Sequence, residues 1–193
     1  MIEYLNGQLI ELNPAHTVVD INGIGYFVHI SVNTYSVLSG HKNARLYIHE
    51  VIRDDAHLLF GFHNFEEREL FRLLISVSGV GPNTGVLLLS SLTVNELKET
   101  IVSGDFERLK TVKGIGIKTA QRIIVELKDK LEKTFISTNI FSSSNNTARE
   151  EALSALVTLG FVKKNAEKVV DKILREEPDN TVERIIKVAL KQM

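Results

Sequence analysis

The chain of 193 residues contains no cysteine. This absence excludes a disulfide framework, a thiolate zinc site, an iron–sulfur cluster and a thiol nucleophile. Long apolar runs are also missing, since no stretch approaches the roughly 18–20 residues that a membrane span requires. The first residues, Met1-Ile2-Glu3-Tyr4, lack the basic and apolar regions of a signal peptide. We therefore expect a cytoplasmic protein.

Charge of either sign is in little excess, because the formal net charge is −1. The charges are unevenly distributed, however. Residues 1–62 contain six acidic side chains against three basic ones, whereas the stretch from Lys110 to Arg122 contains Lys110, Lys113, Lys118 and Arg122 and no acid. This uneven distribution indicates that one surface of the protein binds a charged partner. The alternative is that the basic stretch is only a solvent-exposed helix face.

Residues 1–63 predict a small β-barrel of the OB type. Short runs of β-branched and aromatic residues, such as residues 17–21 and 26–30, are separated by turn signals. Asn22-Gly23-Ile24-Gly25 is typical of a hairpin turn, and residues 45–51 and 57–62 flank a second polar tip at Arg53-Asp54-Asp55-Ala56. About five strands in roughly 60 residues fit such a barrel.

Residues 64–134 predict an all-α domain. Asn64-Phe65-Glu66-Glu67 and Thr93-Val94-Asn95-Glu96 have the form of capping boxes, in which Glu67 and Glu96 would reach back to the start of the helix. Asp105 begins another helix, and a long helix ends near Lys133.

The remaining residues predict a linker and a separate module. Residues 135–147 are rich in serine, threonine and asparagine, which favours a flexible linker. A third capping box begins at Thr147, and residues 148–193 contain three amphipathic helices at roughly 148–159, 163–176 and 181–192. The predicted fold class is thus a multidomain α+β protein with an OB-like barrel, an all-α domain and a three-helix docking module.

The all-α domain contains an internal repeat. Gly79-Val80-Gly81 and Gly114-Ile115-Gly116 lie 35 residues apart, each between two helical runs and each soon followed by a threonine. Two glycines allow a tight reversal and a close approach of bare backbone to a ligand. We expect Val80 and Ile115 to tuck between the helices, and the next helix to offer its N-terminal amides to a phosphate. Lys118 adds a full charge.

These features predict two helix–hairpin–helix motifs that bind the DNA backbone without reading its sequence. A nucleotide-binding P-loop is excluded because Ile117, rather than glycine, precedes Lys118. The six histidines all fall within residues 16–63 and form no metal-binding motif. Asp54 and Asp55 could form half of a metal site, and solvated turn residues are the commoner interpretation.

Two rival functions remain open from the residues alone. In a helix–hairpin–helix glycosylase or AP-lyase, Lys118 would be an imine-forming nucleophile, but no aspartate follows the second hairpin before Asp129. In a structural scaffold, the hairpins would pack only against protein. The acid-free stretch from Lys110 to Arg122 argues against the scaffold.

The chain resembles the RuvA family along essentially its whole length. Four strings carry the resemblance: residues 53–62, the Gly79-Val80-Gly81-Pro82 hairpin, residues 114–129 and the Leu159-Gly160-Phe161 corner. The resemblance implies a non-catalytic subunit without a cofactor or metal, which forms a homotetramer, one or two per junction, and holds a four-way Holliday junction open and flat. It also implies docking of the RuvB ATPase hexamer, and the RuvC resolvase as a further partner.

The resemblance also implies roles for individual residues. Backbone contacts fall on Gly79, Val80, Gly81, Asn83, Gly114, Ile115, Gly116, Lys118, Thr119 and Arg122. Asp54 and Asp55 match an acidic pin near the junction centre, where carboxylates repel phosphates. Leu156, Leu159 and Phe161 are candidates for docking the motor, with a place in the core as the alternative.

Two positions depart from the family pattern. Asn83 and Ile117 stand where lysines are expected, which predicts weaker binding with a flatter salt dependence.

Overall fold

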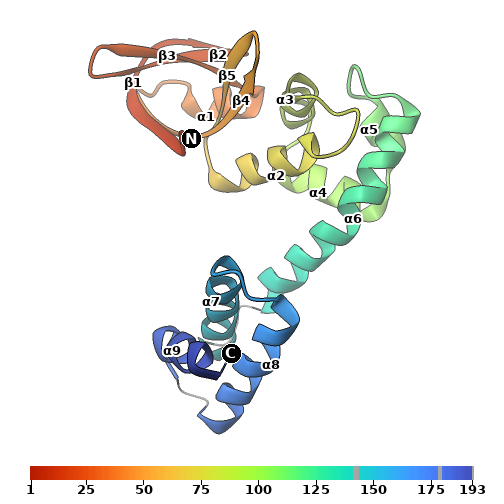
Figure 1. Cartoon of the computed structure of the whole chain (residues 1–193). Coiled ribbons are helices and arrows are strands. Elements are labelled where there is room, and N and C mark those ends of the chain that lie inside the picture. Colours follow the sequence, from red (N-terminus) through yellow and green to blue (C-terminus); the bar gives the residue numbers. More distant parts are fainter. Residues whose placement is uncertain (141–143, 178–179, 193) are drawn as a thin grey trace. The chain divides into compact units, whose positions relative to one another are not determined.

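A computed structural model describes residues 1–140, 144–177 and 180–192, and the side chains of residues 132–147, 150 and 176 lie outside that description. The chain folds into two compact units, Met1–Glu132 and Lys133–Met193 (Figure 1). Within the described residues, no helix is long and apolar enough to cross a membrane.

The first unit begins with a closed barrel, as predicted. Its strands are β1 (Tyr4–Asn13), β2 (His16–Ile21), β3 (Ile24–Ile30), β4 (Asn43–Arg53) and β5 (Ala56–Phe62). They close in the order β1-β2-β3-β5-β4, with only the β3–β5 pair parallel. The predicted hairpin turn is present at Asn22 and Gly23, which both have positive φ, as the favoured two-residue turn requires. The barrel encloses a core that includes Val19, Val28 and Ile48.

The helix α1 (Val32–Leu38) between β3 and β4 was not predicted from the sequence. Ser31 caps it, because its side chain accepts a hydrogen bond from the Thr34 amide at 3.0 Å. Its seven residues, three of them β-branched, give little helical periodicity, and packing against the helical domain supplies the missing stability. One such contact is the bond from the Asn33 side chain to the carbonyl of Leu89 at 2.6 Å.

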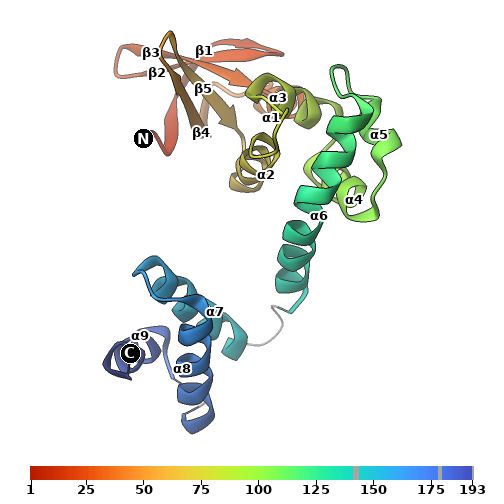
Figure 2. The ribbon, with the colours of Figure 1, turned by 45° about the vertical axis from the view of Figure 1, so that its right-hand side comes forward.

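The helical domain follows without a break. Its helices are α2 (Phe65–Ile75), α3 (Pro82–Ser91), α4 (Val94–Ser103), α5 (Phe106–Lys110) and α6 (Ile117–Ile140). Phe60 and Phe62 of β5 lie in the same core as these helices. Their rings stand 5.4 and 4.8 Å from the ring of Phe71 in α2. The end of β5 therefore contributes to the core of the helical domain, while the barrel keeps a core of its own. Figure 2 shows α2 following directly after β5.

The first two predicted capping boxes have different outcomes. At Thr93 the box is complete, with the threonine side chain and Glu96 bonded reciprocally. At Asn64 only half of it forms: the Asn64 side chain accepts from the Glu67 amide at 2.7 Å. The prediction that Glu67 reaches back is wrong, because its carboxylate bonds to Ser31 and Thr34 at the start of α1 instead.

The second unit contains α7 (Ser144–Thr158), α8 (Lys163–Glu176) and α9 (Val182–Gln192). Ala152, Leu156, Ala166, Val170 and Ile185 are among the residues of its core. The helix was predicted to begin after Thr147, yet α7 already begins at Ser144, and α6 extends to Ile140. Much of the segment that was predicted as a linker, residues 135–147, is therefore helical. This segment contains no glycine or proline that would end a helix. Residues 141–143 lie outside the described residues.

Candidate nucleic-acid interface

The two hairpins have the same internal geometry. In the first, the Val80 amide donates to the carbonyl of Val77 at 3.0 Å, and the Gly85 amide donates to Gly81 at 2.9 Å. In the second, the Ile115 amide donates to Val112 at 3.1 Å, and the Ala120 amide donates to Gly116 at 2.9 Å. Each bond recurs 35 residues later in the sequence, so the repeat read from the sequence is a structural repeat.

The first glycine of each hairpin is needed for the turn itself. Gly79 and Gly114 have φ values of 92° and 90°, a region that side chains with a Cβ rarely adopt. Val80 and Ile115 follow with only 4% and 6% of their surface exposed. The prediction that these two side chains are buried between the helices is confirmed. Any contact of Val80 or Ile115 with DNA would therefore be made by main-chain atoms.

The second glycine of each hairpin, Gly81 or Gly116, is not required by the backbone conformation of the turn. Gly81 has φ −83° and ψ 169°, an extended conformation that any residue adopts. A Cβ built on Gly81 or on Gly116 would meet no atom within 4 Å. Neither the backbone conformation nor the packing of the chain therefore requires these glycines, and the space in front of them is open to an outside group.

The helices that follow the hairpins present unpaired amides. α3 has Gly81 as its N-cap, with no side chain to cap it, and Pro82 at its start. The amides of Asn83 and Thr84 in its first turn have no carbonyl acceptor within the helix. In α6 the first helical hydrogen bond is donated by the amide of Ala120, so the amides of residues 117–119 also have no carbonyl acceptor within the helix. Both helix ends thus provide the donors and the dipole that suit a phosphate.

The two hairpins differ in charge. Lys113 and Lys118 are exposed in and after the second hairpin, and neither forms an ion pair within the part of the chain that the structure describes. The equivalent positions of the first hairpin, 35 residues earlier, are Ser78 and Asn83. Lys110, counted above in an acid-free stretch, pairs with Glu107 at 2.7 Å. Its charge is therefore partly neutralised, which weakens that part of the sequence argument.

Arg122 connects the two motifs. It stands in the second turn of α6, and its Nη1 atom donates to the carbonyl of Ser78 in the first hairpin at 3.0 Å. The predicted phosphate-binding side chain thus already contacts the other hairpin, which sequence reasoning did not find.

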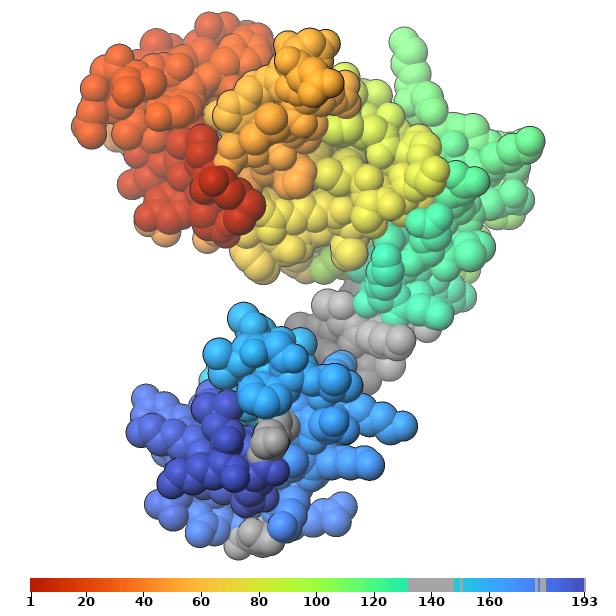
Figure 3. Space-filling model, in the orientation of Figure 1, coloured from red at the N-terminus to blue at the C-terminus, as the bar shows by residue number. Residues whose placement is uncertain are grey.

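The predicted acidic pin is the tip of the β4–β5 hairpin. Asp54 and Asp55 are the two exposed turn residues between Arg53 and Ala56. In Figures 1 and 2 this tip and the second hairpin, between α5 and α6, point to the same side of the first unit. Figure 3 shows both as protrusions at the top of the surface. An acidic point therefore stands on the same side as a basic hairpin.

Two buried charged residues join the barrel to α2. Glu67, 1% exposed, accepts from the Ser31 hydroxyl at 2.6 Å and the Thr34 hydroxyl at 2.7 Å. Arg68, also 1% exposed, donates to the carbonyl of Glu3 at 3.0 Å and pairs with the carboxylate of Glu3 at 2.6 Å. The hydrogen bond from Arg68 holds the pKa of Glu3 below its usual value.

The candidate docking residues of the second unit separate into different environments. Leu156 is fully buried in the core, which is the alternative given for it in the sequence analysis, so its side chain presents no surface for docking. Phe161 packs against the same core, whereas Leu159 is 60% exposed. Leu159 lines an apolar hollow between α7 and α9 together with Ala155 and Ile186.

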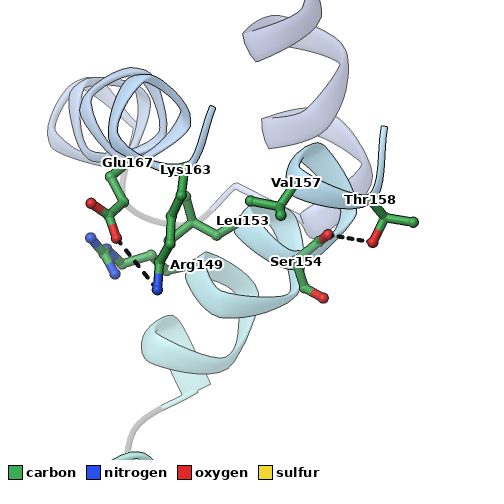
Figure 4. A pocket seen from close by; sticks show the side chains of 7 residues that line it. All are labelled: Arg149, Leu153, Ser154, Val157, Thr158, Lys163 and Glu167. Carbon is green, nitrogen blue, oxygen red and sulfur yellow. Dashed lines mark hydrogen bonds and ion pairs between the residues drawn. The ribbon is translucent and has the colours of Figure 1, made fainter. Parts of the chain in front are cut away.

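A second hollow lies between α7 and α8. Figure 4 shows its lining, in which the charged side chains gather on one side and the apolar ones lie between them and two hydroxyl residues. It is lined by Arg149, Leu153, Ser154, Val157, Thr158, Lys163 and Glu167. Lys163 stands 4.0 Å from Glu167, and Arg149 pairs with Asp171 at 2.6 Å. The Arg149 hydrogen bond lowers the pKa of Asp171.

No group of three or more metal-ligating side chains occurs among the described residues. The features that do occur define a class of protein: a closed barrel packed through β5 on a tandem helix–hairpin–helix domain, followed by a separate three-helix unit.

Comparison with known proteins identifies the family. Residues 1–61 match the RuvA N terminal domain, residues 71–129 match the SAM-like helix-hairpin-helix tandem, and residues 147–193 match the RuvA C-terminal domain. The Holliday junction branch migration complex subunit RuvA of Christiangramia forsetii is 51% identical over 193 residues, covering all of both chains. The proteins of the same name from Bacteroides thetaiotaomicron and Cytophaga hutchinsonii are 51% and 46% identical to this chain. These two alignments cover 100% and 99% of both chains, respectively. The chain belongs to the RuvA family.

Proposed function

We propose that this protein binds four-way DNA junctions through the phosphate backbone and takes part in branch migration as a non-catalytic subunit. The observation that carries the proposal is the pair of equivalent hairpins, each with open space at its second glycine and unpaired amides at the following helix. Backbone amides and a helix dipole bind phosphate without regard to base sequence. The names of the relatives, which are subunits of a Holliday junction branch migration complex, support the same function.

The acidic tip would provide the preference for a junction over plain duplex. The tip of the β4–β5 hairpin, which carries Asp54 and Asp55, lies on the same side as the second hairpin. A carboxylate about 8 Å from a phosphate in water costs about 0.5 kcal/mol. In an open four-way crossover the strands diverge and leave room for these charges, whereas a continuous duplex would bring several phosphates against them. The pin would therefore disfavour duplex more than it disfavours a junction.

The protein would act as a homotetramer, with one subunit on each arm of the junction. The second unit would dock the RuvB ATPase, which supplies the energy for branch migration. The apolar hollow with Leu159 at its edge is the surface that suits this contact. The RuvC resolvase would be a further partner.

The test is a gel shift that compares a synthetic four-way junction with a linear duplex of equal length, with and without magnesium. We expect a preference for the junction of at least tenfold. Replacing Asp54 and Asp55 by asparagine keeps the shape of the tip and removes its charge, so duplex affinity should rise about tenfold relative to junction affinity. Equal binding of wild-type protein to both DNAs would refute junction recognition. An unchanged ratio in the Asp54→Asn, Asp55→Asn variant would refute the role of the tip alone.

A further inference from the structure

The first hairpin has no cation of its own at the positions where the second has two. Lys113 and Lys118 of the second motif correspond, 35 residues earlier, to Ser78 and Asn83. The backbone geometry of the hairpins is the same nonetheless. The first hairpin would therefore hold a phosphate with neutral donors only, unless another part of the chain supplies a charge.

Arg122 supplies that charge from the other motif. Its Nη1 atom donates to the Ser78 carbonyl at 3.0 Å, and both residues are exposed. A guanidinium group has five N–H donors, so this bond leaves others for a ligand. The Ser78 carbonyl directly precedes Gly79, the residue with positive φ. Because carbonyl and amide of a trans peptide point in opposite directions, holding the carbonyl toward α6 also fixes the direction of the Gly79 amide.

We propose that Arg122 completes the phosphate site of the first hairpin, although it belongs to the helix of the second. It fixes the Ser78–Gly79 peptide and places a positive charge beside the neutral hairpin, so that the two hairpins are coupled through one side chain. The proposal rests on the proposed function, since it assumes that the hairpins bind phosphates.

A double-mutant cycle on the full chain tests this assignment, with affinity for a synthetic four-way junction as the readout. Gly81→Val is designed to disable the first hairpin and Gly116→Val the second. At both positions an added Cβ meets no atom within 4 Å, so we expect both variants to fold. Arg122→Ala is combined with each. Lys118→Ala, one turn earlier on the same helix, is the matched control for loss of a charge. Circular dichroism confirms that each variant is folded.

We expect Arg122→Ala to weaken junction binding about tenfold, equivalent to roughly 1.4 kcal/mol. Beside Gly81→Val the same change should cost less than about twofold, because its target is already disabled. Beside Gly116→Val it should keep its full cost. Lys118→Ala should show the reverse pattern. Arg122→Lys keeps the charge and loses the planar fork, so its affinity should be intermediate.

A rescue experiment gives a second, independent test. Asn83→Lys places a cation at the first hairpin in the position that Lys118 has at the second, and it should restore most of the affinity of Arg122→Ala. Ile117→Lys adds the same charge to the second motif and should restore less.

Two results would overturn the proposal in different ways. If Arg122→Ala were additive with Gly81→Val and non-additive with Gly116→Val, Arg122 would serve its own hairpin, and the proposed function would stand. If neither glycine variant weakened binding, the hairpins would not bind the backbone, and the proposed function would fail together with this inference.

Discussion

The two glycines of the first hairpin should respond oppositely to the same substitution. Gly79→Ala forces a Cβ into a backbone with φ 92°, at a cost of about 1–2 kcal/mol. The lower entropy of the unfolded chain when alanine replaces glycine stabilises the folded state by about 0.4–1 kcal/mol. The net effect should be a destabilisation of about 1 kcal/mol. Gly81→Ala receives the same entropic gain without strain, because Gly81 is extended and has no atom near its Cβ position. It should be as stable as the wild type or about 0.5 kcal/mol more stable.

Junction affinity should not follow stability. The new Cβ of Gly81→Ala stands where a phosphate would approach, and the loss of one charge-assisted hydrogen bond, about 1.5 kcal/mol, corresponds to roughly tenfold weaker binding. Thermal unfolding followed by circular dichroism, together with a gel-shift titration at fixed salt, measures both quantities. A Gly81→Ala protein that bound the junction like the wild type would refute the idea that the open space is a phosphate site. Destabilisation of Gly81→Ala equal to that of Gly79→Ala would show that the conformational argument is wrong.

The remaining predictions concern the join between barrel and helices and the docking hollow. Glu67→Ala leaves two fully buried hydroxyls without their acceptor, which should cost about 2–5 kcal/mol and lower the melting temperature of the first unit by roughly 10 °C. The neighbouring Glu66→Ala, which loses an exposed ion pair, should cost less than about 1 kcal/mol; equal melting temperatures would contradict this. Leu159→Ser should keep junction affinity and fold but reduce stimulation of the ATPase motor, whereas Val162→Ser, equally exposed at the surface, should not. Full stimulation with Leu159→Ser would exclude the hollow as the docking surface.

The hairpins could be predicted from the sequence because their geometry is local. A positive φ at Gly79 and Gly114, and a buried aliphatic residue directly after each, follow from turn chemistry within a few residues. The repeat at a fixed spacing strengthened the prediction, since a single Gly-x-Gly turn is common. The barrel was predictable for a related reason, because alternating strands and a two-residue turn at Asn22 and Gly23 are also local signals.

The contacts that cross between elements could not be predicted. Glu67 stands at the position where a capping box expects a glutamate to fold back, yet its carboxylate bonds to two hydroxyls at the start of α1, more than thirty residues away in the sequence. Leu156 lies in the last turn of α7, and Leu159 directly follows the end of that helix. Which of them is covered depends on how α8 and α9 pack, and periodicity alone does not determine that.

The long-range contacts also bear on how a pin and two hairpins can act together. In the proposed function, the charge of Asp54 and Asp55 would discriminate between DNA structures only if its distance from the proposed phosphate sites is fixed. That distance is set by the join between β5 and α2, where Phe60 and Phe62 pack on Phe71. About one turn before Phe71 in α2, Glu67 bonds to Ser31 at the start of α1 and Arg68 bonds to the carbonyl of Glu3. Burying two opposite charges is costly unless every donor and acceptor is matched, and the described residues contain no buried side-chain polar atom without a partner. A weakened join should therefore lower the preference for junctions even where both hairpins still bind phosphate, because a pin without a fixed position repels all DNA alike.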